Sequence, residues 1–168
     1  IRKIGGTIYQ AYMKKYAGVN RETGKAQWYM DVEKTSVGAD GNKTTYTVVE
    51  LTEDITKATQ YDCGTTLPDV IGGFGTSFRA YGFDLSAQFS FQLGGQIYDG
   101  AYQVLMHGGQ SAGTAMHKDL LNAWSEDNKL SDIPRISTAA ADDPGIASQT
   151  AQDRFLTSSN YLTLNNLT

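Results

Sequence analysis

Residues 70–95, VIGGFGTSFRAYGFDLSAQFSFQLGG, decide the fold of this chain. Their second half alternates strictly between apolar and polar residues from Phe83 to Gln92. A period of two is typical of a β-strand with one apolar and one hydrated face. The first half repeats the pattern on even-numbered positions, where Gly72 and Thr76 are the weak points. The stretch therefore predicts two amphipathic strands.

A turn centred on Tyr81 and Gly82 brings the two strands into register as a hairpin. Gly82 suits this turn because two-residue hairpin turns need positive φ angles, which glycine tolerates. A slip of one residue would move every apolar side chain to the wrong face, so the sequence specifies the register. The pairs predicted are Ala80–Phe83, Phe78–Leu85, Thr76–Ala87 and Phe74–Phe89 on one face, and Arg79–Asp84, Ser77–Ser86 and Gly75–Gln88 on the other.

Two environments accept such a hairpin, a soluble all-β domain and a membrane β-barrel. About 12 residues rising roughly 3.3 Å each and tilted by about 45° span some 28 Å, close to the apolar thickness of a bilayer. Soluble strands are shorter, with about 5–6 residues. The hairpin also has a short turn at one end and long segments at the other, an asymmetry typical of outer-membrane barrels. Both interpretations stay open at this point.

Composition excludes some functions. The chain of 168 residues has 14 basic and 18 acidic residues and a net charge of −4, which gives no support for nucleic-acid binding. No run approaches the roughly 20 apolar residues of a membrane helix. Cys63 is the single cysteine, so no disulfide forms within the chain, and a packed thiol is favoured over a catalytic nucleophile. Because the chain opens at Ile1 without a leader and stops inside a predicted strand, we expect a fragment of a longer protein.

The flanking segments predict a mixture of strands, turns and short helices. Asp40-Gly41-Asn42 is a turn signal that predicts a small hairpin. Apolar residues at helical spacing after Gly95 predict two short helices, with Met106 and Trp124 as local core. The expected elements are strands at 5–16, 28–32, 44–51 and 154–168, loops at 17–27, 56–67 and 126–153, and helices at 97–107 and 114–125.

Several separated motifs resemble the SusC/RagA family of TonB-dependent outer-membrane transporters of Bacteroidota. They cover essentially the whole chain, in the order and spacing of the C-terminal part of the family's barrel. The motifs are AGVNRETGKAQWY at 17–29, LPDVIGGFGTSFRAYGFDLSAQFSFQLGGQIYDG at 67–100, YQVLMHGG at 102–109, HKDLLNAW at 117–124, SDIPRIS at 131–137 and RFLTSSNYLTLNNLT at 154–168.

This resemblance implies an all-β fold, as part of a 22-stranded antiparallel transmembrane β-barrel with long extracellular loops that contain short helices. Residues 1–168 would be a fragment of that barrel, with 70–94 as a transmembrane hairpin and its turn in the periplasm. Residues 17–69 and 95–157 would be extracellular loops. The plug and the TonB box of the family lie outside this sequence.

The function implied is TonB-dependent import of glycans, oligosaccharides, peptides or other large nutrients across the cell outer membrane. A SusD-like surface lipoprotein and the TonB complex would be the partners, and outer-membrane lipid would surround the barrel. The resemblance implies no enzyme activity and no cofactor. The alternative from a different class is a soluble all-β module that binds carbohydrate or another partner. Lipid would contact one set of side chains and the lumen another: Phe83, Leu85, Phe89, Phe91 and Leu93 outside, and Ser86, Gln88 and Ser90 inside.

No catalytic, cofactor-binding or metal-binding set is predicted, and substrate-binding residues stay unknown. His107 and His117 lack a carboxylate or cysteine at ligand spacing, which favours surface positions in a loop over a metal pair. The Asp40 turn lacks the acidic residue that a calcium loop needs downstream. The glycines from Gly72 to Gly75 lie within a strand, so they indicate curvature or contact with aromatic neighbours and no phosphate loop.

Two further groups have a functional and a structural interpretation. The pair Arg79–Asp84 is predicted to be a solvated ion pair facing the lumen, with contact to the plug as the alternative. Four aromatic residues in or beside the long loops could stack on sugars, pack against a partner, or pack within the loops, and the last is favoured. These aromatic residues are Trp28, Tyr98, Tyr102 and Trp124.

Overall fold

The computed structural model describes residues 7–37, 42–109, 113–138 and 150–168. Within these ranges the chain is mostly β-strand with very little helix, which confirms the all-β prediction. The strands are β1 (Gln10–Lys14), β2 (Tyr16–Val19), β3 (Ala26–Val37), β4 (Lys43–Thr52), β5 (Gln60–Thr65), β6 (Val70–Ala80), β7 (Phe83–Leu93), β8 (Gln96–Tyr98), β9 (Leu156–Ser158) and β10 (Tyr161–Leu167). The helices are α1 (Gly100–Leu105) and the 3-10 helices η1 (Lys118–Asn122) and η3 (Asp153–Phe155).

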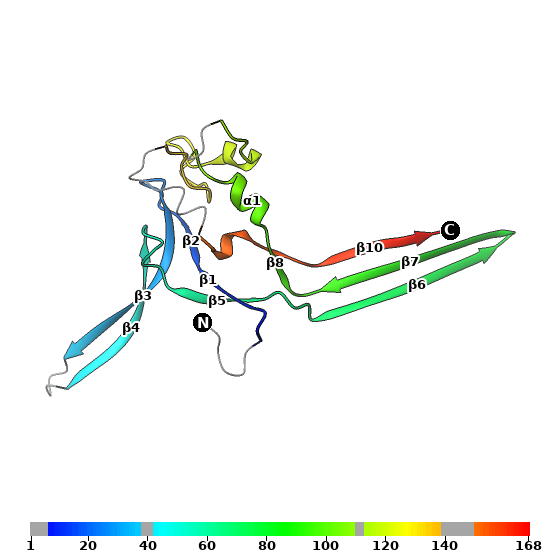
Figure 1. The fold of residues 1–168 in the computed structure, drawn as a ribbon, viewed down its shortest axis with the longest axis horizontal. Helices are drawn as coiled ribbons and strands as arrows, with labels where there is room; N and C mark the ends of the chain where they lie inside the picture. The colour runs from blue at the N-terminus through cyan, green and yellow to red at the C-terminus, as the bar shows by residue number, and fades with distance from the viewer. Residues whose placement is uncertain (1–6, 38–41, 110–112, 139–149) are drawn as a thin grey trace. The chain divides into compact units, whose positions relative to one another are not determined.

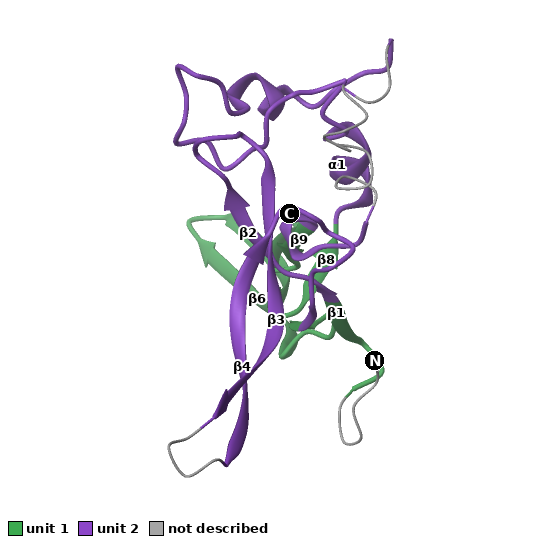
Figure 2. Ribbon diagram, turned by 90° about the vertical axis from the view of Figure 1, so that its left-hand side faces the viewer, with its two compact units in different colours: residues 1–12, 62–98, 156–168 green, residues 13–61, 99–155 purple. Residues whose placement is uncertain are grey.

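The chain folds as two compact units, coloured separately in Figure 2. The first contains residues 1–12, 62–98 and 156–168, and the second contains residues 13–61 and 99–155. Both are assembled from segments that lie far apart in the sequence. Each unit is therefore held together by long-range contacts.

The first unit is built on an antiparallel sheet of three strands in the order β10-β7-β6, which run side by side in Figure 1. Strands β6 and β7 have 11 residues each and pair along their full length, from Val70–Leu93 to Ala80–Phe83. Tyr81 and Gly82 form the turn with φ angles of 52° and 82°. The predicted hairpin, its register and its turn are all confirmed. The two-stranded sheet β8-β9 also lies in this unit, and β1 pairs with β5 in a further two-stranded sheet.

The second unit contains the sheet β2-β3-β4 and the loops that follow α1. Ten residue pairs join β3 to β4, from Trp28–Thr52 to Val37–Lys43. A cluster of buried side chains lies at the Trp28–Thr52 end of this hairpin, and Tyr16 packs against it. The members of this cluster are Ala26, Trp28, Ile55 and Ala58.

Four predictions for the N-terminal half need correction. The single strand expected at 5–16 is two strands, β1 and β2, because they pair in different sheets. The strand expected at 28–32 extends over all of β3, since β4 pairs with its whole length. The loop expected at 17–27 is confined to residues 20–25, where the Asn20 N–H donates to the Lys25 carbonyl at 2.8 Å. The irregular segment 56–67 contains β5. Asp40 and Gly41 lie outside the described residues.

The C-terminal half also differs from the expected elements. The helix predicted at 97–107 begins only at Gly100, after β8, because the Asp99 side chain caps it by accepting from the Tyr102 N–H at 2.8 Å. The helix predicted at 114–125 is the short 3-10 helix η1, which shares the i, i+3 spacing of an α-helix. The strand predicted at 154–168 is confirmed only as β9 and β10, which follow η3.

Candidate functional site

The three-stranded sheet has one apolar face that stays exposed in this structure. Phe83 is 78% exposed and Phe78 is 64% exposed, although both belong to the regular apolar pattern. An exposed apolar patch of this size marks an interaction surface, because soluble monomers rarely expose such patches. By register, the apolar face consists of Val70, Phe74, Phe78 and Ala80 in β6, Phe83, Leu85, Ala87, Phe89, Phe91 and Leu93 in β7, and Leu162, Leu164 and Leu167 in β10.

Aromatic rings pack across the strands of this face. Phe74 stacks on Phe89 with 4.8 Å between ring centroids and 17° between ring planes, and it lies 6.4 Å from the Phe91 ring. Gly72 lies under Phe91, where a Cβ atom would come within 2.7 Å of the ring. The predicted contact between this glycine and an aromatic neighbour is confirmed. The face is thus an ordered surface whose rings contact one another.

The opposite face of the same sheet is polar. Arg79 and Asp84 form the predicted cross-strand ion pair, and their side chains are 83% and 65% exposed. Such solvated pairs contribute little to stability. Farther along, Ser90 Oγ donates to Asn165 Oδ1 at 3.1 Å. The sheet therefore has one apolar and one polar face.

A β-bulge in β10 was not foreseen from the sequence. The register shifts between Leu164 and Asn166, so that Asn165 is an extra residue in the pairing of β10 with β7. Because of this extra residue, Leu164 and Leu167 lie on the same face even though one number is even and the other odd. Simple alternation breaks at Asn165, and the paired asparagines were the available signal.

The loop aromatics Trp28, Tyr102 and Trp124 have partners within the chain. Trp28 is 2% exposed, and its indole N–H donates to Gln152 Oε1 at 3.0 Å, with Gln152 fully buried. The Tyr16 ring meets Trp28 edge-on at 6.2 Å. The favoured interpretation, packing within the loops, is therefore confirmed for Trp28. Gln152 was missed because a lone glutamine in a polar loop carries no sequence signal.

Arg154 lies between two aromatic rings in the same unit. Its guanidinium carbon is 5.2 Å from the Tyr16 ring centroid and 5.5 Å from that of Phe155. The Tyr16 hydroxyl donates to the Asp132 carbonyl at 2.9 Å, and the Tyr16 backbone N–H donates to Asp153 Oδ1 at 2.8 Å. These contacts join β2 to two later parts of the second unit, at Asp132 and at residues 153–155.

Burial raises the pKa of Tyr16 to about 12, with Arg154 opposing part of the rise. Above pH 10 the unfolded tyrosine loses its proton while the folded one keeps it, so the stabilisation decreases as the pH rises from about 10 to 12. We expect the second unit to lose on the order of 2 kcal/mol across this range. Hydrogen exchange of the full-length protein at stepped pH would measure it. Tyr16→Phe should flatten the profile, and an unchanged profile would contradict the assignment.

Trp124 and Tyr102 are also packed. The Trp124 indole N–H donates to the Arg21 carbonyl at 3.2 Å, and its ring lies against Gly24. The Tyr102 hydroxyl donates to Asp119 Oδ2 at 3.0 Å, and its ring contacts His117 edge-on at 4.8 Å. Met106 and Trp124 are both buried, as predicted.

Gly24→Ala should destabilise this packing by about 2–4 kcal/mol, the sum of left-handed backbone strain and overpacking. Gly24 has a φ angle of +72°, and an added Cβ would lie 2.4 Å from the Trp124 ring. Gly113→Ala is a matched control, because Gly113 has a φ angle of +80° and open space around it. Hydrogen exchange over residues 17–25 and 118–137 would report both. Equal losses in the two variants would show that the ring contact has no cost.

The prediction that both histidines lie at the loop surface is wrong for His107. His107 is buried at 8% exposure, with Nε2 3.0 Å from the Thr114 hydroxyl. His117 caps η1 by accepting from the Asp119 N–H at 3.2 Å. The glycine-rich loop sequence concealed these local bonds. In the described ranges, no three His, Cys, Asp or Glu side chains are grouped so as to hold a metal ion.

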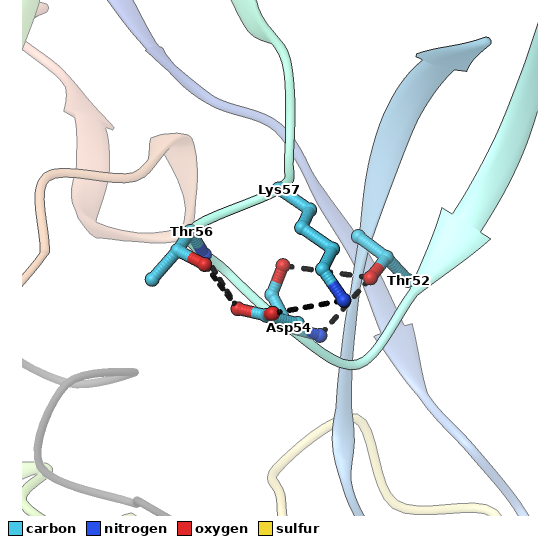
Figure 3. A network of polar contacts seen from close by, with 4 residues as sticks. All are labelled: Thr52, Asp54, Thr56 and Lys57. Carbon is cyan, nitrogen blue, oxygen red and sulfur yellow. Dashed lines mark hydrogen bonds and ion pairs between the residues drawn. The ribbon is translucent and has the colours of Figure 1, made fainter.

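A polar network after β4 holds the turn that leads to β5 (Figure 3). The Asp54 carboxylate accepts from the Thr56 N–H at 2.9 Å and the Thr56 hydroxyl at 2.6 Å, and Lys57 pairs with it at 3.4 Å. The Thr56 bonds, followed by Lys57, lower the pKa of Asp54. This turn carries Ile55 and Ala58 into the buried cluster, so the network has a structural role.

None of the helices in the described part of the chain has the length and apolar character needed to cross a bilayer. Searches of known proteins gave two kinds of match, while no family model matches the chain. The TonB-dependent receptor P3 of Formosa agariphila is 29% identical over 114 residues, which cover 68% of this chain and 10% of that receptor.

Solved structures of a peptide transporter, RagAB, match along most of the chain. One has a TM-score of 0.64 and 31% identity, and covers 94% of this chain and 16% of the matched one. RagAB in an open-open state has a TM-score of 0.59 and 25% identity, with 93% and 15% covered. The chain therefore spans only a small part of the length of its relatives.

These relatives are TonB-dependent receptors and transporters, a class of proteins that are not enzymes. Within that class, the matches support the resemblance to the SusC/RagA family that the motifs indicated, over a part of the relatives' length.

Proposed function

We propose that this chain forms part of the wall and vestibule of an outer-membrane β-barrel that imports nutrients with energy from the TonB complex. The observation that carries the proposal is the two-faced sheet: an exposed apolar face along β6, β7 and β10 and a polar face behind it. Lipid supplies the apolar environment and a water-filled lumen the polar one. The similarity to RagAB and to a TonB-dependent receptor supports the same function.

In this proposal the sheet is one portion of a closed, 22-stranded barrel. Closure is required because lipid offers no hydrogen-bond partner to the free edges of β6 and β10. The turn at Tyr81 lies in the periplasm, since short turns face that side of outer-membrane barrels. Residues 17–69 and 95–157, which include most of the second unit, are then extracellular, where a SusD-like lipoprotein would cover the vestibule.

Lipid quenching tests the wall directly. Single cysteines at positions 85 to 92 of the full-length protein, in a cysteine-free background, would carry a fluorophore in bilayers that contain brominated lipid. Quenching is expected at the odd positions, such as Leu85 and Phe89, and not at even ones, such as Ser86 and Gln88. Absence of quenching at both sets would favour the soluble all-β module and overturn the barrel.

Uptake measurements test the substrate and the energy coupling. We propose a peptide or an oligosaccharide as the nutrient, the former because the RagAB structures are of a peptide transporter. Cells with the full-length protein would receive labelled peptides or oligosaccharides, with and without a functional TonB complex. Uptake of either class only when TonB is functional supports the proposal, and uptake that does not depend on TonB contradicts it.

A further inference from the structure

Tyr81 occupies a position where its residue type is unfavourable. Among the described residues it is the only one other than glycine with a positive φ angle, 52°. Two-residue hairpin turns favour Asn, Asp or Gly at this position, because a Cβ atom strains the left-handed backbone. The local structure therefore gives no reason for a tyrosine here.

The Tyr81 side chain gains nothing from the rest of the described chain. It is fully exposed, at 101%, and no ring contact or hydrogen bond joins its side chain to another described residue. A strained backbone that holds an uncontacted ring indicates a partner outside the chain.

The surroundings of the turn identify the kind of partner. Phe78 and Phe83 are exposed on the apolar face beside the turn, while Arg79 and Asp84 form an ion pair on the other face. From Phe83 to Leu93, residues rising roughly 3.3 Å each at about 45° tilt cover some 23 Å along the membrane normal, close to the apolar band of about 25 Å in outer-membrane barrels. If this face fills the band, the turn lies at its boundary with water.

We propose that Tyr81 anchors the hairpin in the lipid head-group layer, an inference that rests on the proposed function. Its ring would lie among the first acyl carbons and its hydroxyl among the head groups. A tyrosine suits this boundary because it has an apolar body and a polar tip. The residue is then retained for its lipid contact, in spite of the strain in the turn.

Depth-dependent quenching tests this position in the full-length protein. Fluorophores on Tyr81→Cys and Phe89→Cys, in a cysteine-free background, would be compared in phosphatidylcholine bilayers brominated near the head group or near the acyl-chain end. We expect position 81 to be quenched more by shallow bromine and position 89 more by deep bromine. Quenching at 89 but not at 81, or at the same depth for both, overturns the anchor alone. Quenching at neither position instead contradicts the proposed barrel.

A second experiment compares two Tyr81 variants, one that favours the turn and one that keeps the proposed lipid contact. Tyr81→Asn favours the turn but removes the ring, whereas Tyr81→Trp keeps an amphipathic ring. We expect Tyr81→Asn to lower the urea midpoint of the full-length protein in bilayers and Tyr81→Trp to retain it. An unchanged or higher midpoint for Tyr81→Asn would show that the ring has no partner, and would overturn the proposal.

Discussion

Phe89→Arg is expected to cost the folded protein about 2–4 kcal/mol in a bilayer, because in the proposed barrel it places a charge on the lipid face near the middle of the membrane. Phe89 stacks on Phe74 at 4.8 Å, so the variant also loses an aromatic contact within the sheet. Urea unfolding of the full-length protein in vesicles would measure the loss. In cells, we expect a sharp fall in the amount of protein in the outer membrane.

Two variants separate the charge from the lost ring. Gln88→Arg places the same charge on the polar face of the same strand and should change the unfolding free energy by less than about 1 kcal/mol. Phe89→Leu keeps an apolar side chain but removes the stacking. If Gln88→Arg is as damaging as Phe89→Arg, the two faces have the same environment and the assignment of lipid to one of them is wrong.

Trp28→Ala is expected to destabilise the second unit by about 3–5 kcal/mol, the usual cost of removing a large buried aromatic side chain. The change also leaves the fully buried Gln152 amide without the indole N–H that it accepts at 3.0 Å. Hydrogen exchange over residues 13–61 and 99–155 of the full-length protein would report the loss, together with faster proteolysis of these segments.

Trp28→Phe and Tyr46→Ala are the comparison variants. The first retains a ring but removes the hydrogen bond, so it should cost about 1–3 kcal/mol. The second truncates an exposed aromatic residue of β4 and should be close to neutral. An effect of Trp28→Ala no larger than that of Tyr46→Ala would contradict the buried role of the indole and restore a binding role for Trp28.

The parts of the fold that depend on local sequence were predictable. The β6–β7 hairpin is specified by alternation and a glycine in its turn, so its whole register followed from the residues. The Arg79–Asp84 pair followed from the same register. The family motifs then favoured lipid as the environment, which alternation alone had left open between lipid and a soluble core.

The parts that depend on long-range contacts were not predictable. Trp28 and Gln152 are 124 positions apart, and neither neighbourhood predicts their contact. β5 was missed because its burial alternates among polar and small residues, so the strand shows no apolar pattern. The 3-10 helix η1 has the spacing of an α-helix, but the Trp124 N–H donates to the Ile133 carbonyl at 2.8 Å and holds the following chain in another path.

The bulge at Asn165 also affects how this strand tolerates changes in length. In a regular strand without a bulge, deletion of one residue moves every later side chain to the opposite face of the sheet. At this bulge two asparagines lie opposite one residue of β7, so loss of Asn165 would leave Leu164, Asn166 and Leu167 in plain alternation. Leu167 would stay on the side of Ala87. The bulge is thus a place where β10 can lose one residue without exchanging its polar and apolar faces.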